Sequence, residues 1–111
     1  RPDNTYAGAD LSPAGEWQLD IKVQTKAVLE NILHYLQLNS GDLSHLVDVT
    51  VFLKNIKDFD AYNEVYNSFF PETGPCRTTV EVSALPRPQI LIEIKGTAFI
   101  EEGQSQVNEA F

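Results

Sequence analysis

Apolar residues recur at three- and four-residue spacing in the stretch DIKVQTKAVLENILHYLQ, which covers positions 20–37. This spacing gathers apolar side chains on one side of an α-helix and leaves the charged ones on the other. The apolar positions are Ile21, Val28, Leu29, Ile32, Leu33 and Leu36. Asp20 is suited to cap the first turn, and Gly41 is suited to end the helix in a left-handed conformation. The pattern therefore predicts an amphipathic helix.

The next two segments differ in the spacing at which apolar residues recur. HLVDVTVFLKN, at 45–55, alternates apolar and polar residues. This predicts a strand with one face made of Val47, Val49, Val51 and Leu53. FDAYNEVYNSFF, at 59–70, carries aromatic residues at helical spacing, and Asp58 or Asp60 can cap it. A second helix is therefore expected after the strand.

Two more strands are predicted at 76–84 and 90–99, with LPRPQ as the connection between them. Alternation predicts that the helices cover one face of these strands, made of Thr78, Val80, Val82, Ile90, Ile92 and Ile94. The opposite face would then carry Arg77, Thr79, Leu91, Glu93, Lys95 and Phe99. The polar segment 1–16 shows no period and is expected to be a loop, and the polar tail 101–111 lacks a core face and is expected to be loose or packed on a neighbour.

The element order is helix, strand, helix, strand, strand, which predicts an α+β or α/β layered domain with helices on one face of a sheet. Leu91 and Phe99 fall on the uncovered face and need a cover of their own. We therefore expect copies of the chain to associate through that face as a homo-oligomer.

Composition narrows the class of protein. With 111 residues and 42% hydrophobic content, the chain fits a single domain. A net charge of −8 without any basic cluster argues against nucleic-acid binding. No apolar run is long enough for a membrane span, and the single cysteine allows no internal disulfide. A soluble cytoplasmic protein is therefore expected.

Arg77 and Glu93 are the candidate chemical groups. If their strands pair as neighbours, Arg77, Thr79 and Glu93 could share a pocket on the uncovered face, where copies are expected to meet. A guanidinium matches a carboxylate with two parallel hydrogen bonds, and a partly desolvated glutamate can exchange a proton. An Arg–Glu ion pair that only orients subunits is the other interpretation, and both stay open.

Other groups offer less. His34, His45 and Cys76 are too few and too dispersed to form a zinc site, so no metal is expected. Both histidines are expected to be surface or structural residues. Cys76 is interpreted as a small packed residue, since no base partner for its thiol is evident.

Two stretches, PCRTTVEVSALPRPQILIEIKGTAF and VDVTVFLKNIKDFDAYNEVYNSFF, resemble the Rid (YjgF) family of imine and enamine deaminases. The late family motif runs proline, small residue, arginine, strand, Leu-Pro and an apolar strand carrying glutamate. The resemblance covers 20–100. RPDNTYAGAD, QLDIKVQTKAVLENI and GPCRTTVEV are most similar to the branch of 2-aminomuconate deaminases.

The resemblance implies a chorismate-mutase-like fold, with a mixed β-sheet, two helices on one face and a barrel made by three subunits. It implies that Arg77 binds a carboxylate, that Glu93 positions or activates water, and that Asn63 lies near the cleft between subunits. Thr79 stands where the family commonly has cysteine, so a cysteine-dependent step is not expected. Residues 1–111 are interpreted as one Rid-like domain from which the N-terminal hairpin of the family is missing.

The expected reaction is hydrolytic deamination of 2-aminomuconate to 4-oxalocrotonate (2-oxohex-3-enedioate) and ammonia, without metal or organic cofactor. Arg77 would hold one carboxylate, Glu93 would move protons, and Thr79 and Asn63 would hydrogen-bond water or the amine. Lys95 is the candidate for the second carboxylate, although it also fits a solvated strand lysine. The alternatives are a general deaminase of 2-iminopropanoate or 2-aminoacrylate, and a non-catalytic, ligand-binding or chaperone-like trimer.

Overall fold

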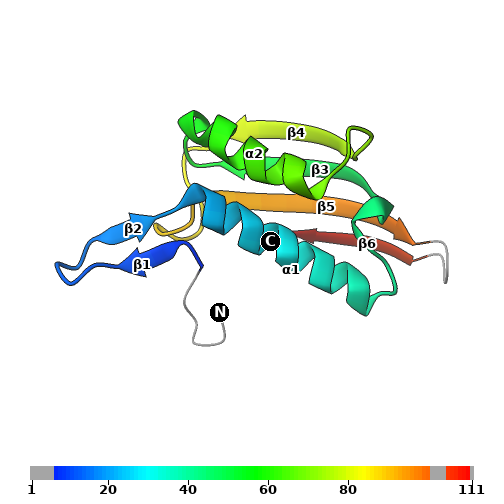
Figure 1. The fold of residues 1–111 in the computed structure, drawn as a ribbon, viewed down its shortest axis with the longest axis horizontal. Helices are drawn as coiled ribbons and strands as arrows, with labels where there is room; N and C mark the ends of the chain where they lie inside the picture. Colours follow the sequence, from blue (N-terminus) through cyan, green and yellow to red (C-terminus); the bar gives the residue numbers. More distant parts are fainter. Residues whose placement is uncertain (1–6, 101–104, 111) are drawn as a thin grey trace.

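The computed structural model of the chain describes residues 7–100 and 105–110. Two helices cover one face of a sheet, and a short two-stranded ribbon projects from the start of the first helix (Figure 1). The elements in chain order are β1 (Ala9–Leu11), β2 (Trp17–Leu19), α1 (Ile21–Leu38), η1 (Leu43–His45), β3 (Leu46–Leu53), η2 (Ile56–Asp58), α2 (Phe59–Phe69), β4 (Cys76–Glu81), β5 (Ile92–Ile100) and β6 (Ser105–Ala110).

The main sheet has the strand order β4-β3-β5-β6. Strands β3 and β4 are parallel and are joined through α2, whereas β5 is antiparallel to both β3 and β6. A crossover of this kind places β4 on one edge of β3 and leaves the other edge for β5. The condition that the strands of Arg77 and Glu93 pair as neighbours is therefore not met, because β3 lies between β4 and β5.

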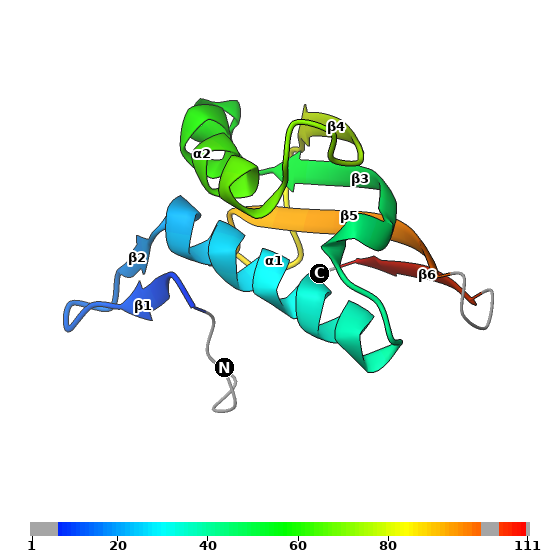
Figure 2. The same ribbon diagram turned by 45° about the vertical axis from the view of Figure 1, so that its right-hand side comes forward.

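Both helices lie on the same face of the sheet (Figures 1 and 2). The core between helices and sheet includes, from the strands, Val49, Val51, Leu53, Ile92, Ile94, Ala98 and Ile100. Alternating residues of β5 are buried, which confirms the predicted helix-facing side of that strand. Within the described ranges, no helix has the length and apolar character needed to cross a membrane.

Helix α1 begins and ends at local signals. The carboxylate of Asp20 accepts hydrogen bonds from the backbone N–H groups of Lys22 at 3.0 Å and Val23 at 3.2 Å, which confirms it as the N-cap. At the other end, Ser40 rather than Gly41 adopts the left-handed conformation, with φ of 64°. Gly41 instead donates its N–H to the carbonyl of Leu36 at 2.8 Å and lies close to the side chain of Ile100.

Strand β3 contains a bulge at its start. Leu46 pairs with Ala98 and Asp48 pairs with Thr97, so Val47 is the extra residue. Leu46 is therefore turned into the core while Val47 is 46% exposed. The predicted face is correct from Val49 onward and wrong for Val47, because an inserted residue shifts the alternation by one.

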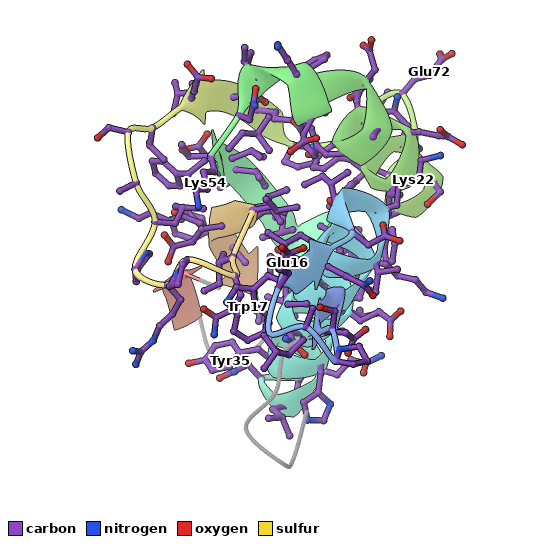
Figure 3. All side chains as sticks on the ribbon, turned by 90° about the vertical axis from the view of Figure 1, so that its left-hand side faces the viewer. Glu16, Trp17, Lys22, Tyr35, Lys54 and Glu72 are labelled. Atoms are coloured by element: carbon purple, nitrogen blue, oxygen red, sulfur yellow. The ribbon has the colours of Figure 1, made fainter. Side chains whose placement is uncertain are left out.

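Both terminal segments contain strands that the polar sequence did not predict. Strands β1 and β2 form an antiparallel ribbon that turns near Gly15, whose φ is 82°. Glu16 and Trp17 lie on this ribbon (Figure 3), and the indole is 44% exposed. Strand β6 extends the main sheet beyond β5, so residues 105–110 are paired in the sheet and are not loose.

Candidate functional site

Arg77 lies in β4 beside Val49 of β3, on the face of the sheet that the helices cover. Its Nη1 donates a hydrogen bond to Oδ1 of Asn63 in α2 at 2.6 Å. The guanidinium carbon is 4.4 Å from the ring centroid of Tyr66 and 5.7 Å from that of Tyr62. Three residues of α2 therefore hold the half-buried guanidinium.

The sequence of α2 explains this arrangement. Tyr62 and Tyr66 are four residues apart, and Asn63 and Tyr66 are three apart, so all three side chains emerge from one side of the helix. The turn before α2 is fixed by Asn55, whose side chain accepts a hydrogen bond from the N–H of Lys57 at 2.9 Å. The contacts of Tyr62 with Thr79 and of Asn63 with Arg77 show that this side of α2 is turned toward β4.

Thr79 lies two residues after Arg77 and faces the same way. Its hydroxyl is 2.6 Å from the hydroxyl of Tyr62, and it pairs with buried Val51 in β3. The structure thus brings together Asn63, Arg77 and Thr79 from the predicted site. Their side chains lie on the helix-covered face, so the predicted face of β4 is wrong.

Glu93 lies on the other face of the sheet. It pairs with Phe52 of β3, whereas the neighbours Ile92 and Ile94 point into the core. Lys95, two residues further along β5, is exposed on the same face as Glu93. The prediction that Arg77 and Glu93 of one chain share a pocket is therefore wrong, because β3 separates their strands and the two side chains point to opposite faces.

Among the residues that the structure describes, none neutralises the charge of Arg77. Within residues 7–100, no carboxylate forms an ion pair with it. Burial is the largest cause that raises the pKa of Tyr66 above its ordinary value of 10.0, although the Arg77 charge acts in the opposite direction. Tyr66 is consequently a neutral phenol at physiological pH. A half-buried cation held only by neutral groups is suited to bind an anion.

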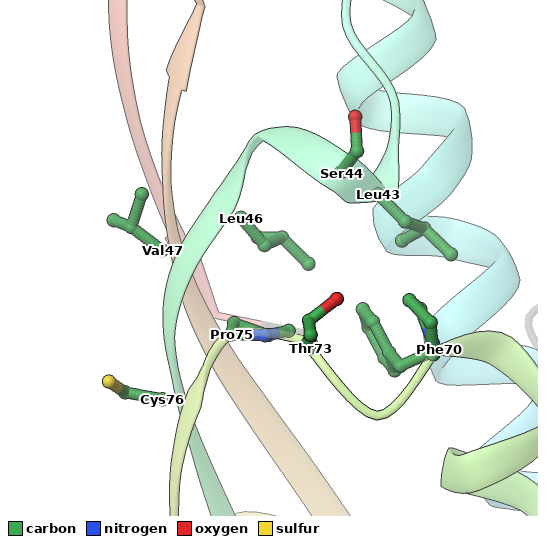
Figure 4. A pocket seen from close by; sticks show the side chains of 10 residues that line it. Leu43, Ser44, Leu46, Val47, Phe70, Thr73, Pro75 and Cys76 are labelled. Carbon is green, nitrogen blue, oxygen red and sulfur yellow. The ribbon is translucent and has the colours of Figure 1, made fainter.

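A cavity of about 410 Å³ lies beside this cluster, between η1, the start of β3 and the turn after α2. Leu43, Leu46, Phe70 and Thr73 point toward one another around it (Figure 4). The ring of Phe70 also stacks on Tyr66, with centroids 4.5 Å apart. Sequence reasoning missed this cavity, because its lining comes from two separate segments, 43–47 and 70–76, with no common period.

The remaining candidate residues of the sequence have a local structural role or no assigned role. His45 accepts a hydrogen bond at Nδ1 from the N–H of Asp42 at 3.0 Å, which confirms a structural role for this histidine. Asp42 in turn caps the short helix η1 through the N–H of Ser44 at 2.8 Å. Cys76 is exposed, so its interpretation as a packed residue is wrong.

Comparison with known proteins places the chain in a family. Residues 8–100 match the family model described as endoribonuclease L-PSP, and the chain belongs to this family, which is the Rid (YjgF) family indicated by its motifs. A RutC family protein of Pyrococcus abyssi is 48% identical over 82 residues, which cover 74% of this chain and 64% of the relative. The chain thus spans less than two thirds of the length of this relative.

Solved structures agree with the fold. A Thermotoga maritima protein described as a candidate endoribonuclease has a TM-score of 0.70 and 32% identity, with 88% of each chain covered. A YjgF family member from Neisseria meningitidis has a TM-score of 0.67 and 32% identity, with 70% of this chain and 66% of that chain covered. The predicted α+β fold of the Rid (YjgF) family, with a mixed sheet and two helices on one face, is confirmed.

Proposed function

We propose that this chain hydrolyses a small imine or enamine that carries a carboxylate, and releases ammonia without a metal or organic cofactor. The observation that carries the proposal is Arg77. Its guanidinium is half-buried, is held by Asn63, Tyr62 and Tyr66, and has no carboxylate partner within residues 7–100. A planar guanidinium without such a partner can donate two parallel hydrogen bonds to the two oxygens of a substrate carboxylate.

The chemistry follows from a carboxylate fixed next to the reacting carbon. An enamine first takes a proton on carbon and becomes the imine. Water then adds to the C=N carbon, and the resulting carbinolamine loses ammonia and leaves a C=O group. Arg77 would draw electron density from the adjacent carbon, while Thr79 and Asn63, which contact Tyr62 and Arg77, would hydrogen-bond water or the amine. Each stage moves a proton, so an acid–base group is needed at the site.

Glu93 is the proposed acid–base group, supplied by a neighbouring copy of the chain. Within one chain it lies on the face opposite to Arg77. That face carries exposed Val80 and Phe99, at 38% and 54% exposure, which favour association. We propose a homotrimer or a multiple of trimers, in which the edge strand β4 of one copy meets the open face of the next.

The particular substrate proposed is 2-aminomuconate, which would yield 4-oxalocrotonate. It has two carboxylates, and Lys95 shares the open face with Glu93. A copy that brings Glu93 to Arg77 would therefore bring a second cation close to the far carboxylate. A substrate with one carboxylate, such as 2-aminoacrylate or 2-iminopropanoate, would use Arg77 and Glu93 alone.

The decisive measurement is ammonia release by the purified protein with 2-aminomuconate and with 2-aminoacrylate. We expect deamination of at least one, with Arg77→Ala lowering kcat/KM by about 100- to 10,000-fold and Arg77→Lys recovering little, since an ammonium lacks the planar fork. A large preference for 2-aminoacrylate would remove the aminomuconate assignment. Equal rates for wild type and Arg77→Ala would remove the enzymatic proposal and leave a binding protein.

The family model is named for an endoribonuclease, so RNA cleavage is a second activity to test. The net charge of −8 would repel a phosphate backbone, and we therefore expect no salt-sensitive binding to single-stranded RNA. Tight RNA binding that weakens steeply with salt would contradict this expectation.

A further inference from the structure

We propose that Tyr66 is a positioning residue for Arg77, and that its neutral aromatic ring, not its hydroxyl, fixes the guanidinium for an incoming carboxylate. The inference rests on the proposed role of Arg77 as the carboxylate anchor. It concerns the residue that decides where the anchor lies before any ligand is bound.

The geometry identifies Tyr66 as the principal support. Its ring centroid is 4.4 Å from the guanidinium carbon, whereas the ring of Tyr62 is 5.7 Å away. Phe70 stacks on the same Tyr66 ring at 4.5 Å with 29° between the planes, and Tyr62 contacts it edge to face at 6.1 Å. The ring is therefore packed against two other rings, which restrict its movement.

A ring is a better support here than an acidic residue. A carboxylate beneath Arg77 would occupy its N–H groups and neutralise the charge that the ligand needs. An aromatic face attracts the cation through its quadrupole and leaves the N–H groups unused. Asn63 accepts from one of them, at Nη1, and no other described residue accepts from the guanidinium, so the remaining donors of the fork are available to a carboxylate.

The hydroxyl of Tyr66 takes no visible part in this support. It is buried and has no hydrogen-bond partner among the described residues. Burial also disfavours its phenolate form, so it does not serve as a counter-ion to Arg77. Packing alone would be satisfied by an aliphatic side chain, whereas the guanidinium requires a ring.

Two substitutions at Tyr66 separate these roles. Tyr66→Phe keeps the ring, and Tyr66→Leu keeps an apolar side chain without it. Fumarate is a suitable probe because it is a dicarboxylate that cannot be deaminated, and its Kd is measured by calorimetry at a temperature where all variants are folded. We expect Tyr66→Leu to weaken binding by about 5- to 30-fold, and Tyr66→Phe by less than about 2-fold.

Phe59→Leu is the matched control. Phe59 belongs to the same aromatic cluster and contacts Tyr62 with centroids 5.5 Å apart, but no contact joins it to Arg77. Loss of this ring should lower stability without changing the Kd for fumarate. A general weakening of the core would instead raise the Kd in Phe59→Leu and Tyr66→Leu alike, which would overturn the proposal.

A second readout makes the inference testable without a ligand. The Nε–H signal of Arg77 in NMR spectra should be ordered and shifted by the ring current in wild type and in Tyr66→Phe, and should lose both properties in Tyr66→Leu. An unchanged Arg77 signal in Tyr66→Leu would overturn the role of Tyr66, whatever the outcome with fumarate. Absence of fumarate binding by wild type, with the Arg77 signal behaving as expected, would overturn only the role of Arg77 as an anchor.

Discussion

The two faces of the main sheet differ in how far the chain itself buries their side chains. On the helix-covered face, Val51 and Ile94 are fully buried, and even the charged group at the edge, Arg77, is held by the side chains of α2. On the open face, Phe52 and Glu93 are only half-buried, and Phe99 is 54% exposed. Among the described residues, one face is thus covered within the single chain, and the other keeps apolar and ionisable groups partly exposed.

This difference bears directly on the proposed site. The anchor lies on the complete face and is preorganised by its own chain, whereas the acid lies on the incomplete face. A site that needs both can form only if the open face of one copy reaches the β4 edge of another. Function would then depend on assembly, although folding of the core would not.

The sharpest test mixes two inactive variants. Arg77→Ala and Glu93→Gln should each lower the deamination rate by about 100- to 10,000-fold. If each site takes Arg77 from one copy and Glu93 from the next, co-refolding equal amounts of the two variants should restore about a quarter of the wild-type rate, since random assembly pairs intact groups at that frequency.

The control for this mixture is co-refolding of Arg77→Ala with the double variant Arg77→Ala/Glu93→Gln, which supplies no intact arginine and should stay inactive. A mixture of the single variants that is no more active than its parents would show that the two groups do not act across subunits.

Two substitutions in β5 compare the contributions of its two faces to stability and to association. Ile94 and Phe99 both belong to β5, and Ile94 has no exposed surface. Ile94→Ala should lower the free energy of unfolding by about 2–5 kcal/mol through lost burial and a cavity. Phe99→Ala should instead shift the oligomer toward smaller species in analytical ultracentrifugation. An unchanged mass distribution in Phe99→Ala would remove Phe99 from the proposed interface.

Local periodicity predicted most of the helix-covered face. The helical spacing of apolar residues located α1 and α2, and the alternation in β5 assigned Ile92 and Ile94 to the core. These assignments need only the residues of one element, because each element has a strongly apolar side. The cap at Asp20 was predictable for the same reason, since its partners are two and three residues away.

The site itself was only partly predictable. Asn63, Arg77 and Thr79 lie close together in the structure, but the predicted face of β4 was wrong, because its only aliphatic residue, Val80, lies on the exposed side. The orientation of an edge strand depends on its register with β3, and local alternation does not contain that register. Likewise, the polar strands β1, β2 and β6 form through pairing with a neighbour, not through an apolar period.

A buried glutamine joins the helix-covered core to the chain segment that leads into β5. The amide nitrogen of Gln24 donates to the carbonyls of Gly8 at 3.1 Å and Gln89 at 2.9 Å, and its oxygen accepts from the N–H of Leu91 at 2.8 Å. Gln24→Leu removes all three bonds and deprives the Gln89 carbonyl and the Leu91 N–H of these partners, whereas the Gly8 carbonyl still accepts from the N–H of Asp20 at 2.8 Å. The substitution should cost about 2–4 kcal/mol of unfolding free energy.

Gln37→Leu is the matched control for Gln24→Leu, because Gln37 is exposed on the same helix and should change stability by less than about 0.5 kcal/mol. Equal unfolding midpoints in urea for Gln24→Leu and Gln37→Leu would contradict the bridging role of Gln24.

The smallest expected effect concerns Tyr66 at alkaline pH. Burial raises its pKa above the ordinary value of 10.0, so the folded chain holds the phenolic proton more tightly than the unfolded chain does. The contribution of Tyr66 to stability is therefore complete below pH 10 and is lost as the pH rises through the folded-state pKa. Tyr66→Phe has no such proton, and its stability should be within about 1 kcal/mol of wild type at neutral pH.

The measurement for Tyr66 is the difference in unfolding free energy between Tyr66→Phe and wild type, followed from pH 7 to pH 11 so that the other tyrosines and the lysines cancel. The difference should stay constant to about pH 10 and then move in favour of Tyr66→Phe. A shift in favour of wild type would mean that Arg77 stabilises a phenolate in the folded chain. The guanidinium would then be neutralised within its own subunit, and the helix-covered face would no longer offer an unpaired cation to a carboxylate.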